Sequence, residues 1–226
     1  MPCALCGDII PRTVARCPHC GAWARRRDFR AVGVAVFMLL GFNAFIALGS
    51  GISLLRVGRP LRTETHDTYD PVGTGRALAP YADVFAVCAV LAGLTGLLYL
   101  GWLWRAHRQS PGPHHHHRAW VVLGWVLPVV NLWLPPRVVY DVWVNSGRYR
   151  TAERQVAGVV VAGWWTCLLL ALLLARLFGA AHADTLADAR FDVHLGVAAA
   201  ACQALAAALC MVTVFHITRL QVVRDD

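Results

Sequence analysis

Four long apolar runs constrain the fold of this chain more than any other feature. They occupy residues 31–55, 82–104, 156–178 and 193–217. The hydrocarbon core of a bilayer is about 30 Å thick, and a helix needs around 20 apolar residues to cross it. Hydrophobic residues make up 58% of the 226 residues and charged residues only 15%, which is not the composition of a soluble domain. The sequence therefore predicts an all-α polytopic membrane protein with a transmembrane domain over 31–220.

Arginine placement predicts which side of the membrane the connecting segments face. Six arginines precede the first run: Arg12, Arg16, Arg25, Arg26, Arg27 and Arg30. Arginines also follow the second run in 105–118, whereas 179–192 carries three aspartates against one arginine. Short segments rich in basic residues stay in the cytoplasm. We therefore expect a multi-pass protein of the cell (plasma) membrane with a basic linker at 24–30 and a cytoplasmic N-terminus.

The N-terminal head contains two closely spaced cysteine pairs. Residues 3–21 read CALCGDIIPRTVARCPHCG, which places Cys3 with Cys6 and Cys17 with Cys20. Two residues between the members of a pair allow a tight turn that points both sulfurs at one ion, and zinc prefers four tetrahedral ligands of this kind. The sequence predicts a structural Zn²⁺ site with these four thiolates. A pair of redox dithiols or an iron site remains an alternative, although the βαβ context of a redox motif is absent.

The head, residues 1–23, resembles the short bacterial zinc-ribbon domains found at the N-terminus of membrane proteins. This resemblance implies a cytoplasmic module that contacts a protein partner or assists folding. Nucleic-acid binding by the ribbon is the less favoured alternative, because the chain shows no basic face with aromatic platforms. Four protein ligands also leave no open coordination position for catalysis.

Residues 119–136 are apolar, but they contain helix breakers that the four runs lack. The stretch GWVLPVVNLWLPP carries Pro128, Asn131 and a final proline pair. If it crossed the bilayer, the arginine-rich segment 144–155 would lie outside, against the charge rule. We therefore expect a re-entrant or half-inserted hairpin, in which the Asn131 side chain satisfies backbone groups freed by Pro128 and the proline pair ends the segment. A kinked fifth span is the alternative.

The segment after the hairpin, 137–148, has the pattern of an amphipathic helix in the membrane interface. Its polar stripe consists of Arg137, Asp141, Asn145 and Arg148, and its valines and Trp143 mostly face away from that stripe. Arg137 and Asp141 stand at i and i+4, a spacing that suits an ion pair.

A family resemblance rests on the segment 98–147. The chain is similar here to an uncharacterised actinobacterial membrane family, domain of unknown function 4328, through the motif Trp-x-x-Arg, then Gly-Trp-x-x-Pro-x-x-Asn-Leu-x-x-Pro, then an acidic residue and a Trp. The matching residues are Trp102, Arg105, Gly124, Trp125, Pro128, Asn131, Leu132, Pro135, Asp141 and Trp143. The resemblance implies the membrane architecture and these motif positions, and it carries no activity.

Polar and small residues inside the runs have structural interpretations. Asn43 and Gln203 are expected to join helices through hydrogen bonds. Small residues recur every four positions at Gly196, Ala200, Ala204 and Ala208, which indicates either close helix packing or simply an alanine-rich helix. The run His114–His117 follows Pro-Gly-Pro, and we interpret it as low complexity rather than as a metal site.

The sequence contains no nucleotide-binding loop, serine elbow or His-Glu-x-x-His motif, so we expect no enzyme activity. The favoured function is a non-catalytic membrane adaptor or regulator that contacts the lipid bilayer and, through the ribbon, a protein partner. The alternative is a transporter or channel component whose broken segment lines a pathway, since broken helices mark such sites. An enzyme acting on lipid is the third hypothesis, and a homo-oligomer is left open.

Overall fold

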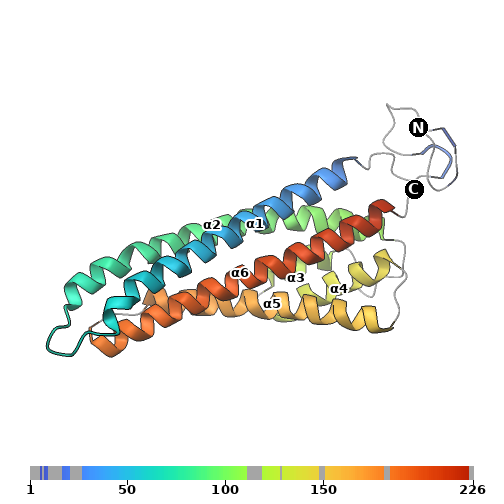
Figure 1. Ribbon diagram of the computed structural model, residues 1–226. Coiled ribbons are helices and arrows are strands. Elements are labelled where there is room, and N and C mark those ends of the chain that lie inside the picture. Colours follow the sequence, from blue (N-terminus) through green and yellow to red (C-terminus); the bar gives the residue numbers. More distant parts are fainter. Residues whose placement is uncertain are drawn as a thin grey trace. The chain divides into compact units, whose positions relative to one another are not determined.

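The structure, a computed structural model, describes residues 6, 8–9, 17–20, 27–110, 119–127, 129–147, 151–180 and 184–223 (Figure 1). Its helices are α1 (Arg27–Leu61), α2 (Pro71–Gln109), α3 (Trp120–Val126), the 3-10 helix η1 (Val130–Leu132), α4 (Leu134–Ser146), α5 (Thr151–Ala180) and α6 (Leu186–Val223). Within the described residues, α1, α2, α5 and α6 are long and apolar enough to cross a membrane. The predicted all-α architecture, with four helices long and apolar enough to cross a membrane, is confirmed.

The four long helices extend well beyond the predicted spans. Helix α2 has 39 residues and begins at Pro71 rather than near 82. At 1.5 Å per residue it is about 58 Å long, nearly twice the thickness of the hydrocarbon core. Helix α6 likewise begins at Leu186 and has 38 residues. The polar flanks of the apolar runs therefore continue as helix, and the connection between α1 and α2 shortens to residues 62–70.

Side-chain caps explain why α2 and α6 begin where they do. The Oδ1 atom of Asp70 accepts a hydrogen bond of 3.1 Å from the Val72 N–H at the start of α2. Before α6, Thr185 Oγ1 accepts a bond of 3.1 Å from the Asp188 N–H and donates one of 2.7 Å to the Asp188 carboxylate. Such caps satisfy backbone N–H groups that the first helical turn leaves without intrahelical partners.

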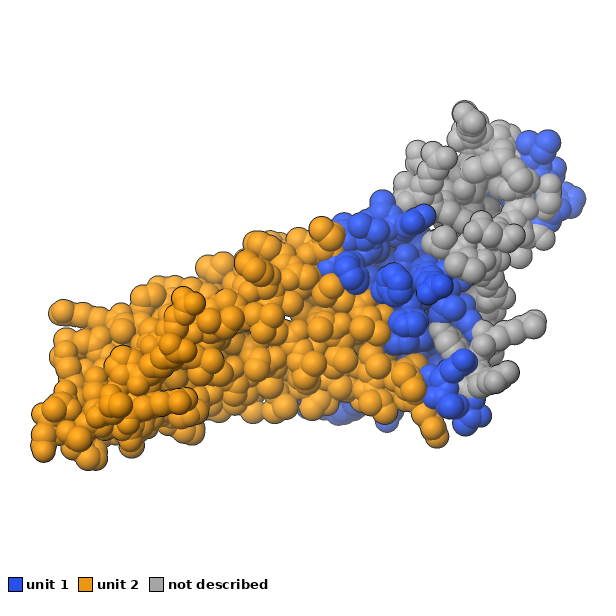
Figure 2. All heavy atoms as spheres, in the orientation of Figure 1, with its two compact units in different colours: residues 1–37, 98–154, 214–226 blue, residues 38–97, 155–213 orange. Residues whose placement is uncertain are grey.

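The chain divides into two compact units, each assembled from distant parts of the sequence (Figure 2). Unit 1 comprises residues 1–37, 98–154 and 214–226, and unit 2 comprises residues 38–97 and 155–213. Each unit takes segments from α1, α2, α5 and α6, and unit 1 adds α3, η1 and α4.

Unit 2 is a helical core surrounded by exposed apolar side chains. Its centre holds Leu54, Phe85 and Phe178, and the two phenyl rings meet edge to face with centroids 5.3 Å apart. Large apolar residues nevertheless point outward, including Phe45, 72% exposed, and Val159, 73% exposed. Apolar patches of this kind on helices of spanning length are what contact with lipid requires, whereas a water-soluble bundle has polar residues there.

Helices α1 and α6 approach closely in unit 2 because small residues face one another. A Cβ atom on Gly196 would lie 2.7 Å from Leu54 Cδ1, and one on Gly51 would lie 3.1 Å from the Ala200 Cβ. Of the two interpretations of this repeat, close packing holds at Gly196 and Ala200, whereas Ala208 is exposed. The expected link through Asn43 is also confirmed, because its Nδ2 donates a 3.1 Å hydrogen bond to Thr95 Oγ1 of α2.

In unit 1 the apolar segment 119–136 is not one continuous helix. Helix α3 has only seven residues, and at 1.5 Å per residue it covers about 10 Å. The single turn of η1 comes next, and α4 then runs for 13 residues. The prediction that the proline pair ends the segment is wrong, because Pro135 and Pro136 lie in the first turn of α4. Proline is tolerated there, since first-turn N–H groups have no intrahelical acceptor.

Candidate functional site

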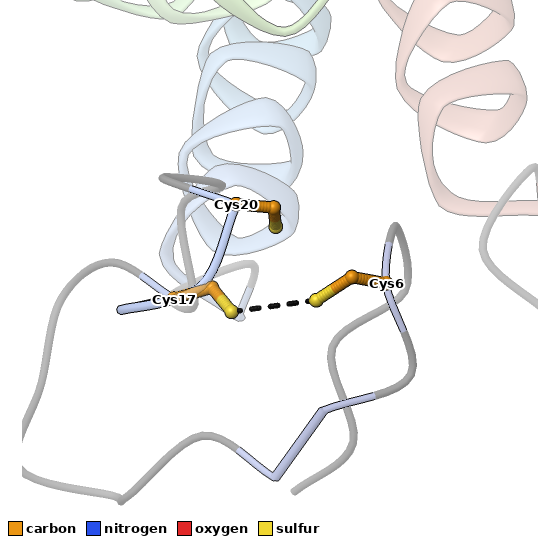
Figure 3. A group of neighbouring side chains, drawn as sticks. All are labelled: Cys6, Cys17 and Cys20. Atoms are coloured by element: carbon orange, nitrogen blue, oxygen red, sulfur yellow. Dashed lines mark hydrogen bonds between the residues drawn. The ribbon is translucent and has the colours of Figure 1, made fainter.

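Three thiols of the N-terminal head converge in the structure. The Sγ atoms of Cys6, Cys17 and Cys20 all lie within 4.8 Å of one another (Figure 3). The Cys6 and Cys17 sulfurs are 3.6 Å apart, and the described cysteines are not joined by disulfides. Residues 18–20 form the turn that brings Cys20 back toward Cys17. Cys3, the fourth predicted ligand, lies outside the described residues.

The distance between the Cys6 and Cys17 sulfurs fits two ligands of a tetrahedral metal ion. With zinc–sulfur distances of about 2.3 Å, tetrahedral geometry separates two ligand sulfurs by about 3.8 Å. The observed 3.6 Å is close to that value and far from the roughly 2.05 Å of a disulfide. Cys17 is only 2% exposed, while Cys6 and Cys20 are exposed. The three thiols are therefore close enough to hold a metal ion.

The second candidate site is the broken segment, and main-chain hydrogen bonds hold its break together. The Leu127 N–H donates to the Leu123 carbonyl, and the Asn131 N–H donates to the Leu127 carbonyl at 2.8 Å. The carbonyl of Val130 accepts from Trp133 at the end of η1. Pro128 itself lies outside the described residues. Main-chain hydrogen bonds therefore continue on both sides of the turn between α3 and α4.

Asn131 does not play its predicted part within the described residues. Its main-chain N–H, rather than its side chain, makes the hydrogen bond across the break. The side-chain Oδ1 is buried and has no hydrogen-bond partner there. Leaving a buried carbonyl oxygen unsatisfied costs roughly 1–3 kcal/mol, and such groups often mark a site for water or a ligand.

Gly124, a motif residue, allows α3 to pack against α4. A Cβ atom at this position would lie 2.9 Å from Leu134 Cδ2 and 3.5 Å from Leu134 Cβ. Gly124 and Leu134 are both buried. The glycine therefore sets the closeness of the two short helices on either side of the break.

Replacing Gly124 with Val is expected to destabilise the broken segment. The added methyl groups would overlap the Leu134 side chain, and overpacking of this kind costs about 1–3 kcal/mol. We expect a lower thermal unfolding midpoint and new protease cleavage between α3 and α4 in purified protein. Gly101→Val is the matched control, because nothing lies within 4 Å of a Cβ at Gly101. Equal midpoints for both variants would contradict the proposed role of Gly124.

Aromatic contacts join two motif tryptophans through a residue that the motif does not contain. Tyr99, 3% exposed, lies with its ring centroid 5.4 Å from that of Trp102 and 6.1 Å from that of Trp125. Trp102 is completely buried, stacks on Phe29 at 6.2 Å, and donates a 3.3 Å hydrogen bond to Thr218 Oγ1. The tryptophans thus fix α2 against α1, α3 and α6 within unit 1.

A buried polar link connects α4 to the ends of α2 and α6. Gln221 Nε2 donates to the Ala106 carbonyl at 3.0 Å and to Ser146 Oγ at 2.9 Å. Ser146 is 2% exposed and in turn donates to the Val142 carbonyl at 2.6 Å. Sequence reasoning missed Tyr99, Ser146 and Gln221. Only the polar character of Gln221 just past an apolar run could have indicated such a link.

The remaining motif residues divide into buried and exposed groups. Trp143 is 4% exposed and stacks on His216 with ring centroids 5.5 Å apart, and Pro135 is also buried. Arg105 is exposed and Asp141 is half-buried; Arg137, the first residue of the polar stripe of α4, is also exposed. Helix α4 therefore has the predicted amphipathic pattern, but its apolar face packs within the protein. The Arg137–Asp141 ion pair stays a prediction, while Arg148 and His114–His117 lie outside the described residues.

These features define the class of protein. It is an α-helical protein with four helices of membrane-spanning character, a short broken segment between the second and third, and a cluster of metal-competent thiols. The chain belongs to the family of a domain of unknown function, DUF4328, whose model matches residues 64–219. The suspected family is thereby confirmed. No curated protein and no solved structure matched the chain.

The family match covers only part of the chain. It covers α2 to α6 almost completely, including the broken segment, whereas the cysteine-rich head and α1 precede it. The thiol cluster therefore lies outside the matched residues.

Proposed function

We propose that this protein is a non-catalytic adaptor or regulator of the plasma membrane, with a zinc-bearing head in the cytoplasm. The convergence of Cys6, Cys17 and Cys20 carries this proposal. Cys3 completes a four-thiolate shell for Zn²⁺. A shell filled by protein ligands leaves the ion no position for a substrate, so the zinc holds the head, residues 1–23, in one shape. A small rigid head outside the membrane domain suits contact with a protein partner.

The broken segment 119–136 enters and leaves the membrane on the cytoplasmic side in this proposal. Two observations support this topology. Helix α3 covers about a third of the hydrocarbon core, which is too little for a span. The last residue of α4, Ser146, bonds to Gln221, which also bonds to Ala106 near the end of α2. The segment that starts after α2 thus returns to the same end of α2.

Photo-crosslinking in living cells tests the adaptor role. His19 is exposed and lies between two of the converging thiols. A photoreactive residue at His19 is expected to yield one or a few discrete adducts. The same probe in a Cys6→Ser, Cys17→Ser chain is expected to lose them, because the head loses its shape. A probe at Thr65, exposed between α1 and α2, is the control for non-specific capture. Identical adducts with and without the cysteines would contradict the adaptor role.

A transport function is the second candidate, and one observation favours it. The unsatisfied Oδ1 of Asn131 lies in a broken helix, where membrane transporters place polar groups that contact their solutes. An amide oxygen accepts hydrogen bonds from neutral polar solutes. Reconstituted vesicles would then take up glycerol or urea faster than empty vesicles, and Asn131→Leu would remove the excess. Uptake equal to that of empty vesicles would reject this candidate for neutral solutes.

A further inference from the structure

A groove between α1 and α6 in unit 1 combines an apolar wall with two arginines. Its volume is about 490 Å³, which falls in the size range of ligand sites. Arg30, Val34 and Phe37 line it from α1, and Phe215 and Arg219 line it from α6. Val34 is 54% exposed and Phe215 is 51% exposed, so the wall is open to its surroundings. We call this feature the α1/α6 groove.

The two arginines stand at the edge of the apolar region on both helices. Arg30, Val34 and Phe37 have the i, i+4, i+7 spacing of one helix face, and Phe215 and Arg219 have the i, i+4 spacing. The apolar run of α1 begins at 31 and that of α6 ends at 217. Each guanidinium therefore lies about one turn beyond an exposed apolar side chain, at the depth where lipid headgroups meet acyl chains.

Glycine forms the floor of the groove. A Cβ atom on Gly33 would lie 2.8 Å from Thr218 Oγ1, so only glycine lets the helices come this close. Trp102 of α2 holds the Thr218 side chain in place, because its Nε1 donates a 3.3 Å hydrogen bond to Thr218 Oγ1. The floor is therefore held by α2 as well, and the groove does not depend on a mobile loop.

The charge of the groove selects its occupant. The charged residue that each helix contributes to the lining is an arginine, and the described lining contains no carboxylate. Guanidinium matches phosphate with paired hydrogen bonds, and each basic residue near a membrane surface attracts anionic lipid. An uncharged lipid offers no phosphate to the guanidinium groups. A zwitterionic phospholipid offers one, but its ammonium group cancels the charge of that phosphate, so an anionic phospholipid complements the two arginines best.

We propose that the α1/α6 groove binds one anionic phospholipid of the leaflet that Arg30 and Arg219 face. The lipid phosphate contacts the two guanidinium groups, and an acyl chain lies along Val34, Phe37 and Phe215. This site uses neither the thiols nor the broken segment, so it stands or falls independently of the proposed function.

Native mass spectrometry of the delipidated full-length protein tests this site. Phosphatidylglycerol and phosphatidylcholine with identical chains would be titrated separately. We expect the wild-type protein to bind one phosphatidylglycerol at least about tenfold more tightly than phosphatidylcholine. The Arg30→Gln, Arg219→Gln variant is expected to bind both lipids equally. Arg56→Gln, Arg59→Gln is the matched control, because it removes two exposed arginines at the other end of α1 and should keep the preference.

A second variant separates the groove from charge alone. Val34→Trp keeps both arginines but fills the apolar wall, and it is expected to weaken phosphatidylglycerol binding about as much as the arginine changes do. Excess glycerol 3-phosphate should fail to displace the lipid. Retained preference in Arg30→Gln, Arg219→Gln, unchanged binding by Val34→Trp, or displacement by glycerol 3-phosphate would each overturn the proposal. The last result would indicate a site for small phosphates.

Discussion

Cys17→Ser is expected to reduce the zinc content of the purified protein from about one ion per chain to less than a tenth. Cys17 is the most buried of the converging thiols, and its sulfur lies 3.6 Å from that of Cys6. A serine hydroxyl stays protonated at neutral pH and binds zinc far more weakly than a thiolate. In small zinc domains the metal supplies about 10–16 kcal/mol of apparent free energy, so losing the ion is equivalent to unfolding. Elemental analysis measures the metal, and limited proteolysis measures the folding of the head.

Cys202→Ser serves as the control for this experiment. Cys202 is a half-buried free cysteine in α6, outside the head, so its replacement should leave the zinc content unchanged. A Cys17→Ser protein that still holds one zinc ion would contradict the predicted ligand set. Iron in place of zinc in the wild-type protein would favour the iron alternative, and a metal-free oxidised head would favour the redox dithiols.

The spans could be predicted from sequence because contact with lipid imposes a local rule. A helix that crosses the bilayer needs about 20 predominantly apolar residues, so a hydropathy window alone indicates a helix of this kind. Helix ends obey a different rule, the satisfaction of backbone N–H groups, which hydropathy does not register. Hydropathy therefore placed the starts of α2 and α6 near 82 and 193, although the caps at Asp70 and Thr185 put them at Pro71 and Leu186.

The proline pair shows why a local signal can be misinterpreted. Proline after an apolar stretch can end one helix or begin another. At neither position does the helix need a main-chain N–H from that residue. Packing of the residues after the prolines decides between the two. Val138, Val139 and Val142 are buried inside the protein, and this burial stabilises a helix that starts at Leu134. The sequence contained the amphipathic pattern of α4 but not the surface against which it packs.

The thiol cluster could be predicted from the sequence, whereas the contacts around the motif tryptophans could not, and the reason is geometric. Two cysteines with two residues between them meet through a local turn, so their spacing in the sequence is sufficient to predict that their sulfurs converge. Trp102 and Thr218 are 116 residues apart, and Ser146 and Gln221 are 75 residues apart. Such contacts depend on how distant helices align, which no local pattern specifies. Tyr99 therefore emerges only from the structure, and so do the partners of Gln221, whose polar character is its only signal in the sequence.

A cysteine at Ala152 is expected to be labelled from the cytoplasmic side only. Ala152 is exposed in the first turn of α5, directly after the broken segment and α4. If 119–136 is a hairpin, Ala152 stays on the side where α2 ends. If 119–136 is a fifth span, Ala152 lies outside. The experiment uses a chain whose native cysteines are replaced. An impermeant maleimide is added to intact cells and, in a second sample, after lysis; labelling only after lysis indicates the hairpin, and labelling of intact cells indicates the fifth span.

A cysteine at Thr65, exposed between α1 and α2, is the positive control and should react in intact cells. The contacts of Arg190 explain why we expect the hairpin result. Its Nε donates to the Leu61 carbonyl at 2.9 Å and its Nη2 donates to the Glu64 carbonyl at 3.1 Å. The start of α6 therefore lies beside the loop after α1. A fifth span would reverse α5 and put the start of α6 across a bilayer of about 30 Å from Glu64. Labelling of Ala152→Cys from outside would thus contradict both the hairpin and these hydrogen bonds.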